Sequence, residues 1–129
     1  METVLGFDFG LKRIGVAVGN TLLKQAQPLT VIAAPTNDAK FAAIAELMRE
    51  WQPGICVVGF PSHPDGTEHE MSARCRRFAN QLNGRFGVAT ALVDERYSSA
   101  VIPQRRGEAD DAQAAAIILQ QYFNNHAQS

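Results

Sequence analysis

The chain has 129 residues, with 46% hydrophobic and 19% charged side chains, and its formal net charge is -1. This length and composition predict one globular domain over residues 1–129, and the near-neutral charge excludes a strongly basic nucleic-acid-binding domain. A nucleic acid partner would therefore have to bind a local patch. Two cysteines are too few for a disulfide framework, and we find neither a signal peptide nor an apolar run of membrane-spanning length. We expect a cytoplasmic protein with reduced cysteines and no membrane partner.

The first 34 residues predict three strands. Residues 4–9 are apolar except for Asp8, as expected for a strand inside a covered sheet. Residues 14–19, Ile-Gly-Val-Ala-Val-Gly, alternate bulky and small side chains, so this strand should have one bulky and one small face. A third strand is predicted within residues 25–34. Because the connections between these segments are short, an antiparallel meander is favoured.

The rest of the chain alternates between helix and strand. We predict a helix opening at Asn37 and stopping at Pro53-Gly54, a strand over 55–59, a helix from a capping box at Thr67 to Asn83-Gly84, a strand over 88–93, and a helix starting at Asp110 or Asp111. Parallel neighbours in a sheet need crossover connections. The fold class is therefore α/β, with a mixed five-stranded sheet of a three-strand meander plus two parallel strands, flanked by helices.

Three acids from distant parts of the chain could meet at one edge of this sheet. Asp8 and Glu95 lie at the carboxyl ends of predicted strands, where α/β sheets bind ligands, and the last helix begins with an acid. Carboxylate oxygens suit Mg²⁺ or Mn²⁺, and two such ions can support phosphodiester hydrolysis. Simpler roles are open for each acid: Asp8 could cap a turn, Glu95 could pair with Arg96, and the third could complement the helix dipole.

The two acids at the start of the last helix should lie on different faces of that helix. Asp111 shares its face with Ala115, Ile118 and Tyr122, which should meet the sheet, whereas Asp110 should turn further toward solvent. We therefore favour Asp111 as the ligand, while Asp110 is the alternative.

Cationic residues are placed where they could frame these acids. Lys12, Arg13 and Arg96 are the candidates for binding substrate phosphates, because such contacts supply much of the affinity for nucleic acids. Arg13 is the strongest candidate, and its alternative role is an ion pair with a strand-end carboxylate. Four arginines on or after the second predicted helix are expected to form its solvated face, with an extended RNA track as the alternative: Arg74, Arg76, Arg77 and Arg85.

Several short motifs together resemble the YqgF family of bacterial proteins, which are related to the Holliday-junction resolvase RuvC. The matching residues are Asp8-Phe9-Gly10, Arg13-Ile14-Gly15-Val16-Ala17, Gly59-Phe60-Pro61, Asp65-Gly66-Thr67 and Asp94-Glu95-Arg96. The resemblance covers nearly the whole chain. It implies an RNase H-like fold and a two-metal nuclease with catalytic and metal-binding acids at Asp8, Glu95 and Asp111. It also implies maturation of the 5′ end of 16S ribosomal RNA.

One segment departs from the family pattern. Family members usually have a longer stretch between the positions of Glu95 and Asp111, with a short helix and a lysine shortly before the last acid. Here residues 96–110 are compact and that lysine has no clear counterpart, although Arg105 and Arg106 could supply positive charge.

The sequence leaves more than one function open. The leading hypothesis is a metal-dependent endonuclease acting on structured RNA such as pre-16S rRNA, as a monomer or homodimer. A nuclease of branched DNA resembling Holliday-junction resolvases is the first alternative, and a non-catalytic RNA-binding ribosome-assembly factor is another. A nucleotide-binding phosphotransferase is disfavoured, because such enzymes close two domains around ATP and 129 residues do not supply the second.

Overall fold

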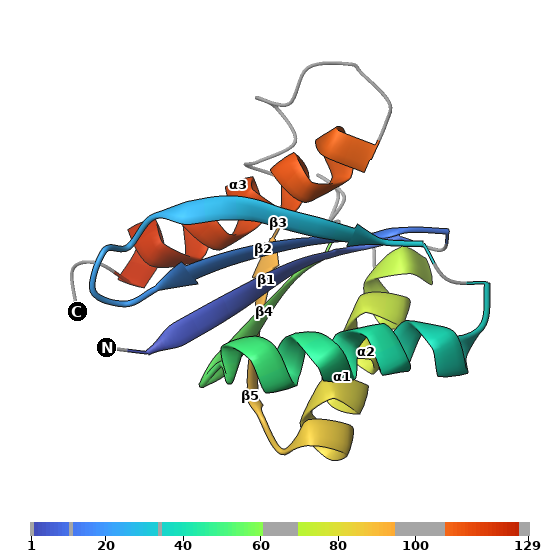
Figure 1. The fold of residues 1–129 in the computed structure, drawn as a ribbon. Helices are drawn as coiled ribbons and strands as arrows, with labels where there is room; N and C mark the ends of the chain where they lie inside the picture. The colour runs from blue at the N-terminus through green and yellow to red at the C-terminus, as the bar shows by residue number, and fades with distance from the viewer. Residues whose placement is uncertain (1, 11, 34, 61–69, 95–107, 127–129) are drawn as a thin grey trace.

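The chain folds into a five-stranded sheet with helices on both faces, as Figure 1 shows for the computed structural model. The elements are β1 (Thr3–Phe9), β2 (Ile14–Asn20), β3 (Ala26–Ile32), α1 (Asn37–Trp51), β4 (Ile55–Phe60), α2 (Glu70–Phe86), β5 (Ala89–Asp94) and α3 (Glu108–His126). The structure describes residues 2–10, 12–33, 35–60, 70–94 and 108–126.

The strand order is β3-β2-β1-β4-β5, so the first strand lies at the centre of the sheet. β1 pairs with β2, and β2 with β3, in antiparallel orientation. On its other side β1 pairs with β4 in parallel orientation, and β4 pairs with β5 in the same way. The predicted meander with two parallel strands is confirmed, and the carboxyl ends of the parallel strands β1, β4 and β5 lie at the same end of the sheet.

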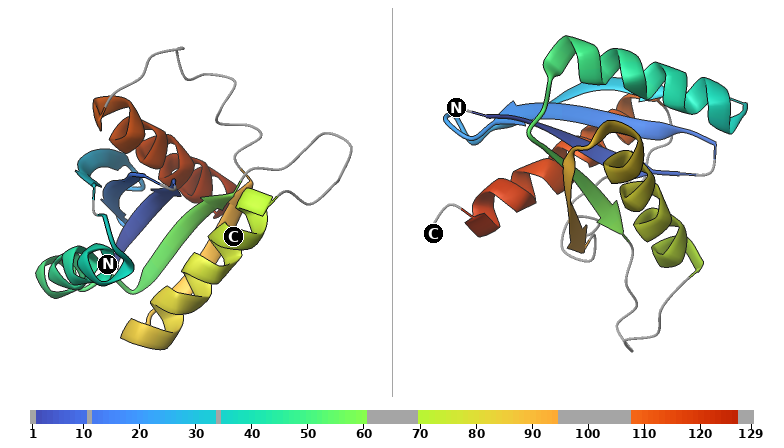
Figure 2. Two further views of the ribbon diagram at one scale, coloured as in Figure 1. Left: turned by 90° about the vertical axis from the view of Figure 1, so that its right-hand side faces the viewer. Right: turned by 90° about the horizontal axis from the view of Figure 1, so that it is seen from below.

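The helices divide between the two faces, with α1 and α2 on one and α3 on the other (Figure 2). Successive strand residues point to opposite faces. In β1, Leu5 and Phe7 therefore pack into the core beneath α1 and α2, while Val4 packs into the core beneath α3. Two hydrophobic cores sandwich the sheet, and each fixes one face of β1.

The small face predicted for β2 is where α3 approaches the sheet. A methyl group on Gly15 would lie 1.9 Å from the backbone oxygen of Asp111, and one on Gly6 would lie 2.8 Å from Cβ of Leu119. Side chains at these positions would therefore push the helix away. The alternation of small and bulky residues in β2 sets how closely α3 lies against the strands.

Two helix boundaries differ from the sequence prediction. α2 continues through Asn83-Gly84 to Phe86, and Gly87, with a φ of 66°, adopts the left-handed conformation that ends it. The Asn83 side chain donates a hydrogen bond of 2.9 Å to the carbonyl of Val88, which stabilises the chain beyond the helix. α3 begins at Glu108 rather than at Asp110 or Asp111, because acidic residues are favourable throughout a first helical turn. Thr67 lies outside the described residues.

Two further expectations concern the thiols and the membrane. Cys56 and Cys75 are both buried thiols, and burial raises the pKa of Cys56 to about 12, which makes it a poor nucleophile at neutral pH. Among the helices of the described ranges, none has the length and apolar character needed to cross a bilayer.

Candidate active site

Asp8 lies one residue before the carboxyl end of β1. It lies between Gly15 of β2 and Gly59 of β4 in the sheet register, so neither neighbouring strand places a side chain beside its carboxylate. By strand alternation, Asp8 faces the same side as Val4 and Gly6, the side covered by α3. The carboxylate therefore points into the space beneath the first turn of α3.

Asp111 enters this space from the first turn of α3. Gly15 lets the helix backbone come against β2 at this residue, directly across from Asp8 in the register. Arg13, just before β2, donates from Nε to Oδ2 of Asp111 at 2.7 Å. The Arg13 side chain is 42% exposed and that of Asp111 29% exposed, so the pair lies at the rim of the site.

The electrostatics of the two acids show that they share one site. The pKa of Asp8 is raised from 3.8 to about 6, first by burial and second by the nearby charge of Asp111. A carboxylate that is desolvated and next to another carboxylate holds its proton more tightly than one in water. A divalent cation between two such groups would offset this unfavourable charge.

The predicted site residues are only partly covered by the described structure. Asp8, Asp111 and Arg13 are brought together, and Lys12 lies exposed in the turn that leads to Arg13. β5 ends at Asp94, so Glu95 and Arg96 follow outside the described residues, as do Arg105 and Arg106. The backbone of Asp110 belongs to α3, but its side chain is not described.

Within the described part of the chain, no group of three His, Cys, Asp or Glu side chains is arranged to hold a metal ion. Two acids meet there, and the third predicted acid lies outside that part. The donors that do meet suit a hard divalent cation, since both are carboxylates and Asp8 is buried beside the charge of Asp111. The residues present therefore fit Mg²⁺ or Mn²⁺.

Arg13 has a different partner from the one considered in the sequence. The alternative role for Arg13 was an ion pair with a strand-end carboxylate, whereas the structure pairs it with Asp111 at a helix start. Sequence reasoning also gave no site role to Gly15 and Gly59. Gly15 makes room for the α3 backbone at Asp111, and Gly59 places no side chain beside Asp8.

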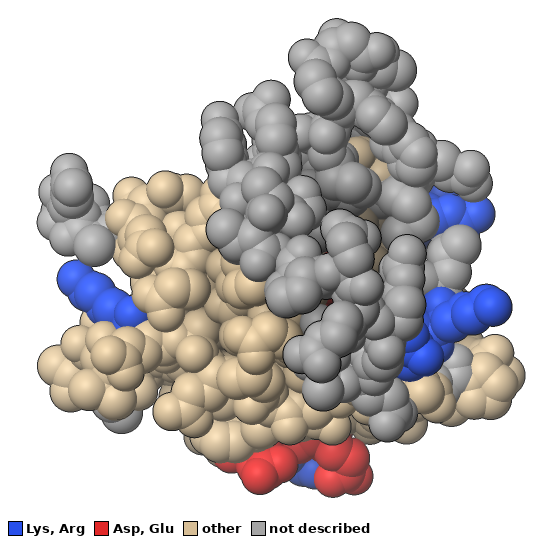
Figure 3. All heavy atoms as spheres, turned by 90° about the horizontal axis from the view of Figure 1, so that it is seen from above, with Lys and Arg blue, Asp and Glu red and all other residues tan. Residues whose placement is uncertain are grey.

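The surface around this edge carries both charges, but in different places. Figure 3 shows lysine and arginine side chains at both the left-hand and the right-hand side of the view, and the β1–β2 turn lies on the right in Figure 1. The acidic side chains visible in that view gather at its lower edge.

The sequence matches one protein family along almost its whole length. A family model described as "RuvX: Holliday junction resolvase" matches residues 2–125. A "Putative pre-16S rRNA nuclease" of Bordetella parapertussis is 57% identical over 125 residues, covering 95% of this chain and 94% of that protein. A protein of the same name from Paraburkholderia xenovorans is 52% identical over 128 residues, covering 95% and 88%.

Solved structures show the same fold at low sequence identity. Thermus thermophilus RuvC in complex with a Holliday junction substrate is 16% identical, has a TM-score of 0.62, and is matched over 99% of this chain and 97% of its own. The fowlpox virus Holliday junction resolvase is 9% identical, with a TM-score of 0.60 and coverages of 95% and 98%. These likenesses confirm the RNase H-like fold.

Proposed function

The chain belongs to the RuvX family, also called YqgF, and from that premise we propose that it is a metal-dependent endonuclease that matures the 5′ end of pre-16S rRNA. The observation that carries the proposal is the meeting of Asp8 and Asp111 at the carboxyl edge of the sheet, with Arg13 bound to one of them. The names of the relatives support RNA as the substrate. Magnesium, or manganese in its place, is the proposed cofactor, and the cytoplasm is the proposed location.

The proposed division of labour follows from the chemistry of each side chain. Asp8 and Asp111 would hold divalent cations through carboxylate oxygens, and Glu95 is proposed as the third acid of the same set. When bound, such cations activate water and offset the charge that develops on a phosphodiester. Lys12, Arg13 and Arg96 are proposed to bind the phosphates on either side of the cut.

A cleavage assay with two polymers tests this proposal. We expect the chain to cut a 5′-extended 16S rRNA precursor in Mg²⁺, not in EDTA, and to leave a four-way DNA junction intact. Cutting of the junction alone would assign the chain to branched DNA. Cutting in EDTA would contradict the metal dependence, and a failure to cut either polymer would contradict the nuclease. Glu95→Gln should remove cutting, whereas Glu50→Gln, an exposed acid in α1, should leave it unchanged.

Arg13 is expected to affect metal and RNA in opposite directions. Because its guanidinium occupies Oδ2 of Asp111, it competes with a cation for that oxygen. Arg13→Gln should therefore tighten Mn²⁺ binding, measured by calorimetry, while it weakens RNA binding and lowers the slope of log Kd against log salt by about 1. An arginine that only braces α3 would leave that slope unchanged.

A further inference from the structure

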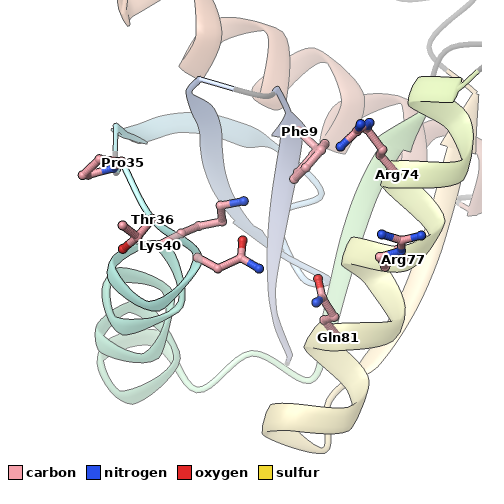
Figure 4. Close-up of a pocket in the computed structure, with 8 residues that line it drawn as sticks. Phe9, Pro35, Thr36, Lys40, Arg74, Arg77 and Gln81 are labelled. Atoms are coloured by element: carbon pink, nitrogen blue, oxygen red, sulfur yellow. The ribbon is translucent and has the colours of Figure 1, made fainter.

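A second basic site lies on the face of the sheet opposite Asp111. Between α1 and α2 there is a hollow of about 340 Å³, shown in Figure 4. The described residues that line it are Phe9, Pro35, Thr36, Asn37, Lys40, Arg74, Arg77 and Gln81. Three of these described residues are cations and none is an acid, so this part of the lining is positively charged in a chain whose net charge is -1.

The cations come from two helices that face each other across Phe9. Lys40 extends from α1 toward the middle of the hollow, and Arg74 extends from α2 toward Phe9 (Figure 4). Arg74, Arg77 and Gln81 are three and four residues apart, the spacing that places side chains on one face of a helix. The face of α2 that carries Arg74 and Arg77 is therefore directed at α1.

Aromatic packing holds one of these cations in place. The Lys40 ammonium lies 5.2 Å from the centre of the Phe9 ring, and Phe9 in turn packs against Phe78 with ring centres 4.9 Å apart. A cation over an aromatic face is attracted to it and loses some of its conformational freedom. Less entropy is then lost when Lys40 binds an anion.

The remaining lining suits a phosphate group. The start of α1 contributes the partial positive charge of a helix N-terminus, with Thr36 as its cap, where the Thr36 hydroxyl accepts a hydrogen bond of 3.1 Å from the Ala39 amide. Asn37 and Gln81 add side-chain amides from opposite walls. Cations, amide donors and a helix N-terminus together provide what an anionic oxygen needs in order to bind.

The hollow and the acid site lie on opposite faces of the sheet, at the same edge. Asp8 and Phe9 are consecutive in β1, and they point to opposite faces at the same edge. A nucleic acid strand held at Asp8 has only to cross that edge to reach Phe9 and Lys40. We propose that this hollow binds a backbone phosphodiester of the same strand, outside the site of cleavage. This inference rests on the proposed function, in which RNA is the substrate.

Two double variants with equal net charge test the proposal. Lys40→Gln/Arg77→Gln removes two cations from the hollow. Lys24→Gln/Arg49→Gln removes two exposed cations, one after β2 and one in the last turn of α1. The probe is a fluorescein-labelled single-stranded RNA of twelve nucleotides, titrated in EDTA at several salt concentrations, with Kd from fluorescence anisotropy. Melting curves check that each variant is folded.

The expected result is a change in the first variant only. The slope of log Kd against log salt concentration should fall by about 0.7 to 1 in this variant, because one phosphate contact on a single strand is removed. Equal slopes in the two variants would overturn the proposal, since they would show a diffuse charge effect. Inorganic phosphate that shifts the amide signals of Asn37 and Lys40 while the RNA slope is unchanged would also overturn it, because the ligand is then free phosphate.

The nuclease and this hollow can fail separately. If the chain cut the precursor RNA fully, but Lys40→Gln/Arg77→Gln left the slope of log Kd for RNA against log salt unchanged, the phosphate site would be rejected and the nuclease kept. A slope that falls as expected in a chain that cuts neither polymer would reject the nuclease and keep the phosphate site.

Discussion

Replacing Asp8 by Asn is expected to make the metal-free protein more stable while it removes cleavage. The pKa of Asp8 is raised from 3.8 to about 6 by burial and by Asp111. The folded state therefore holds the proton more tightly than the unfolded state, so this group's contribution to stability is fully present below pH 4 and is lost as the pH rises through 6. A shift from 3.8 to about 6 corresponds to at most about 3 kcal/mol at pH 7.5.

The measurement compares unfolding free energies of the two proteins in EDTA at pH 4 and pH 7.5. They should be nearly equal at pH 4, and at pH 7.5 Asp8→Asn should melt up to about 10 °C higher. Addition of Mn²⁺ should then stabilise the wild type alone, because only it holds the metal. Cleavage should fall by roughly a thousandfold or more.

Asp38→Asn is the matched control for this change. Asp38 is an exposed acid in the first turn of α1, where its charge favours the helix, so its loss should lower the melting temperature slightly and leave cleavage intact. If Asp8→Asn and the wild type melted alike at pH 7.5, Asp8 would not be in a crowded site. If Asp8→Asn still cut RNA, Asp8 would have no part in the chemistry.

Most of the fold could be predicted from the sequence because its signals are local. The alternation in residues 14–19 predicted a bulky and a small face, and the structure places α3 on the small one. The predicted end of α2 was wrong, because Asn83-Gly84 resembles a helix stop whereas the residue with the left-handed conformation is Gly87. Glycine is tolerated inside a helix at modest cost, so the sequence contains two candidate stops, and the second is the one at which α2 ends.

The site could be predicted in outline but not in its pairings. The position of Asp8 at a strand end, and the face of Asp111 on its helix, are local properties, and the structure does bring these two side chains near each other. The partner of Arg13 depends on how closely α3 lies against β2, which no local pattern measures. The hollow at Lys40 is formed by α1 and α2, which β4 separates along the chain, so the sequence of neither helix alone indicates it. Glu95 remains a prediction.

Gly15 should be as important to this site as the acids, although it carries no functional group. A methyl group there would lie 1.9 Å from the backbone oxygen of Asp111, 2.4 Å from its carbonyl carbon and 3.0 Å from the nitrogen of Ala112. These are backbone atoms of a helix, so no single side chain can turn aside and α3 itself must move. In Gly15→Ala we expect unfolding to become easier by about 3 kcal/mol, as for other overpacked cores.

The same displacement carries Asp111 away from Asp8, and shifts of about 1 Å in a catalytic group can cost about a hundredfold in rate. Gly15→Ala should therefore bind Mn²⁺ weakly and cut RNA slowly even at temperatures where it is folded. Gly84→Ala is the control, because Gly84 lies inside α2 with nothing within 4 Å of the added methyl group. It should gain about 0.5 to 1 kcal/mol in stability, as alanine does over glycine inside a helix, and retain full activity. A folded Gly15→Ala with normal Mn²⁺ affinity would show that the distance between α3 and β2 does not set the geometry of the acids.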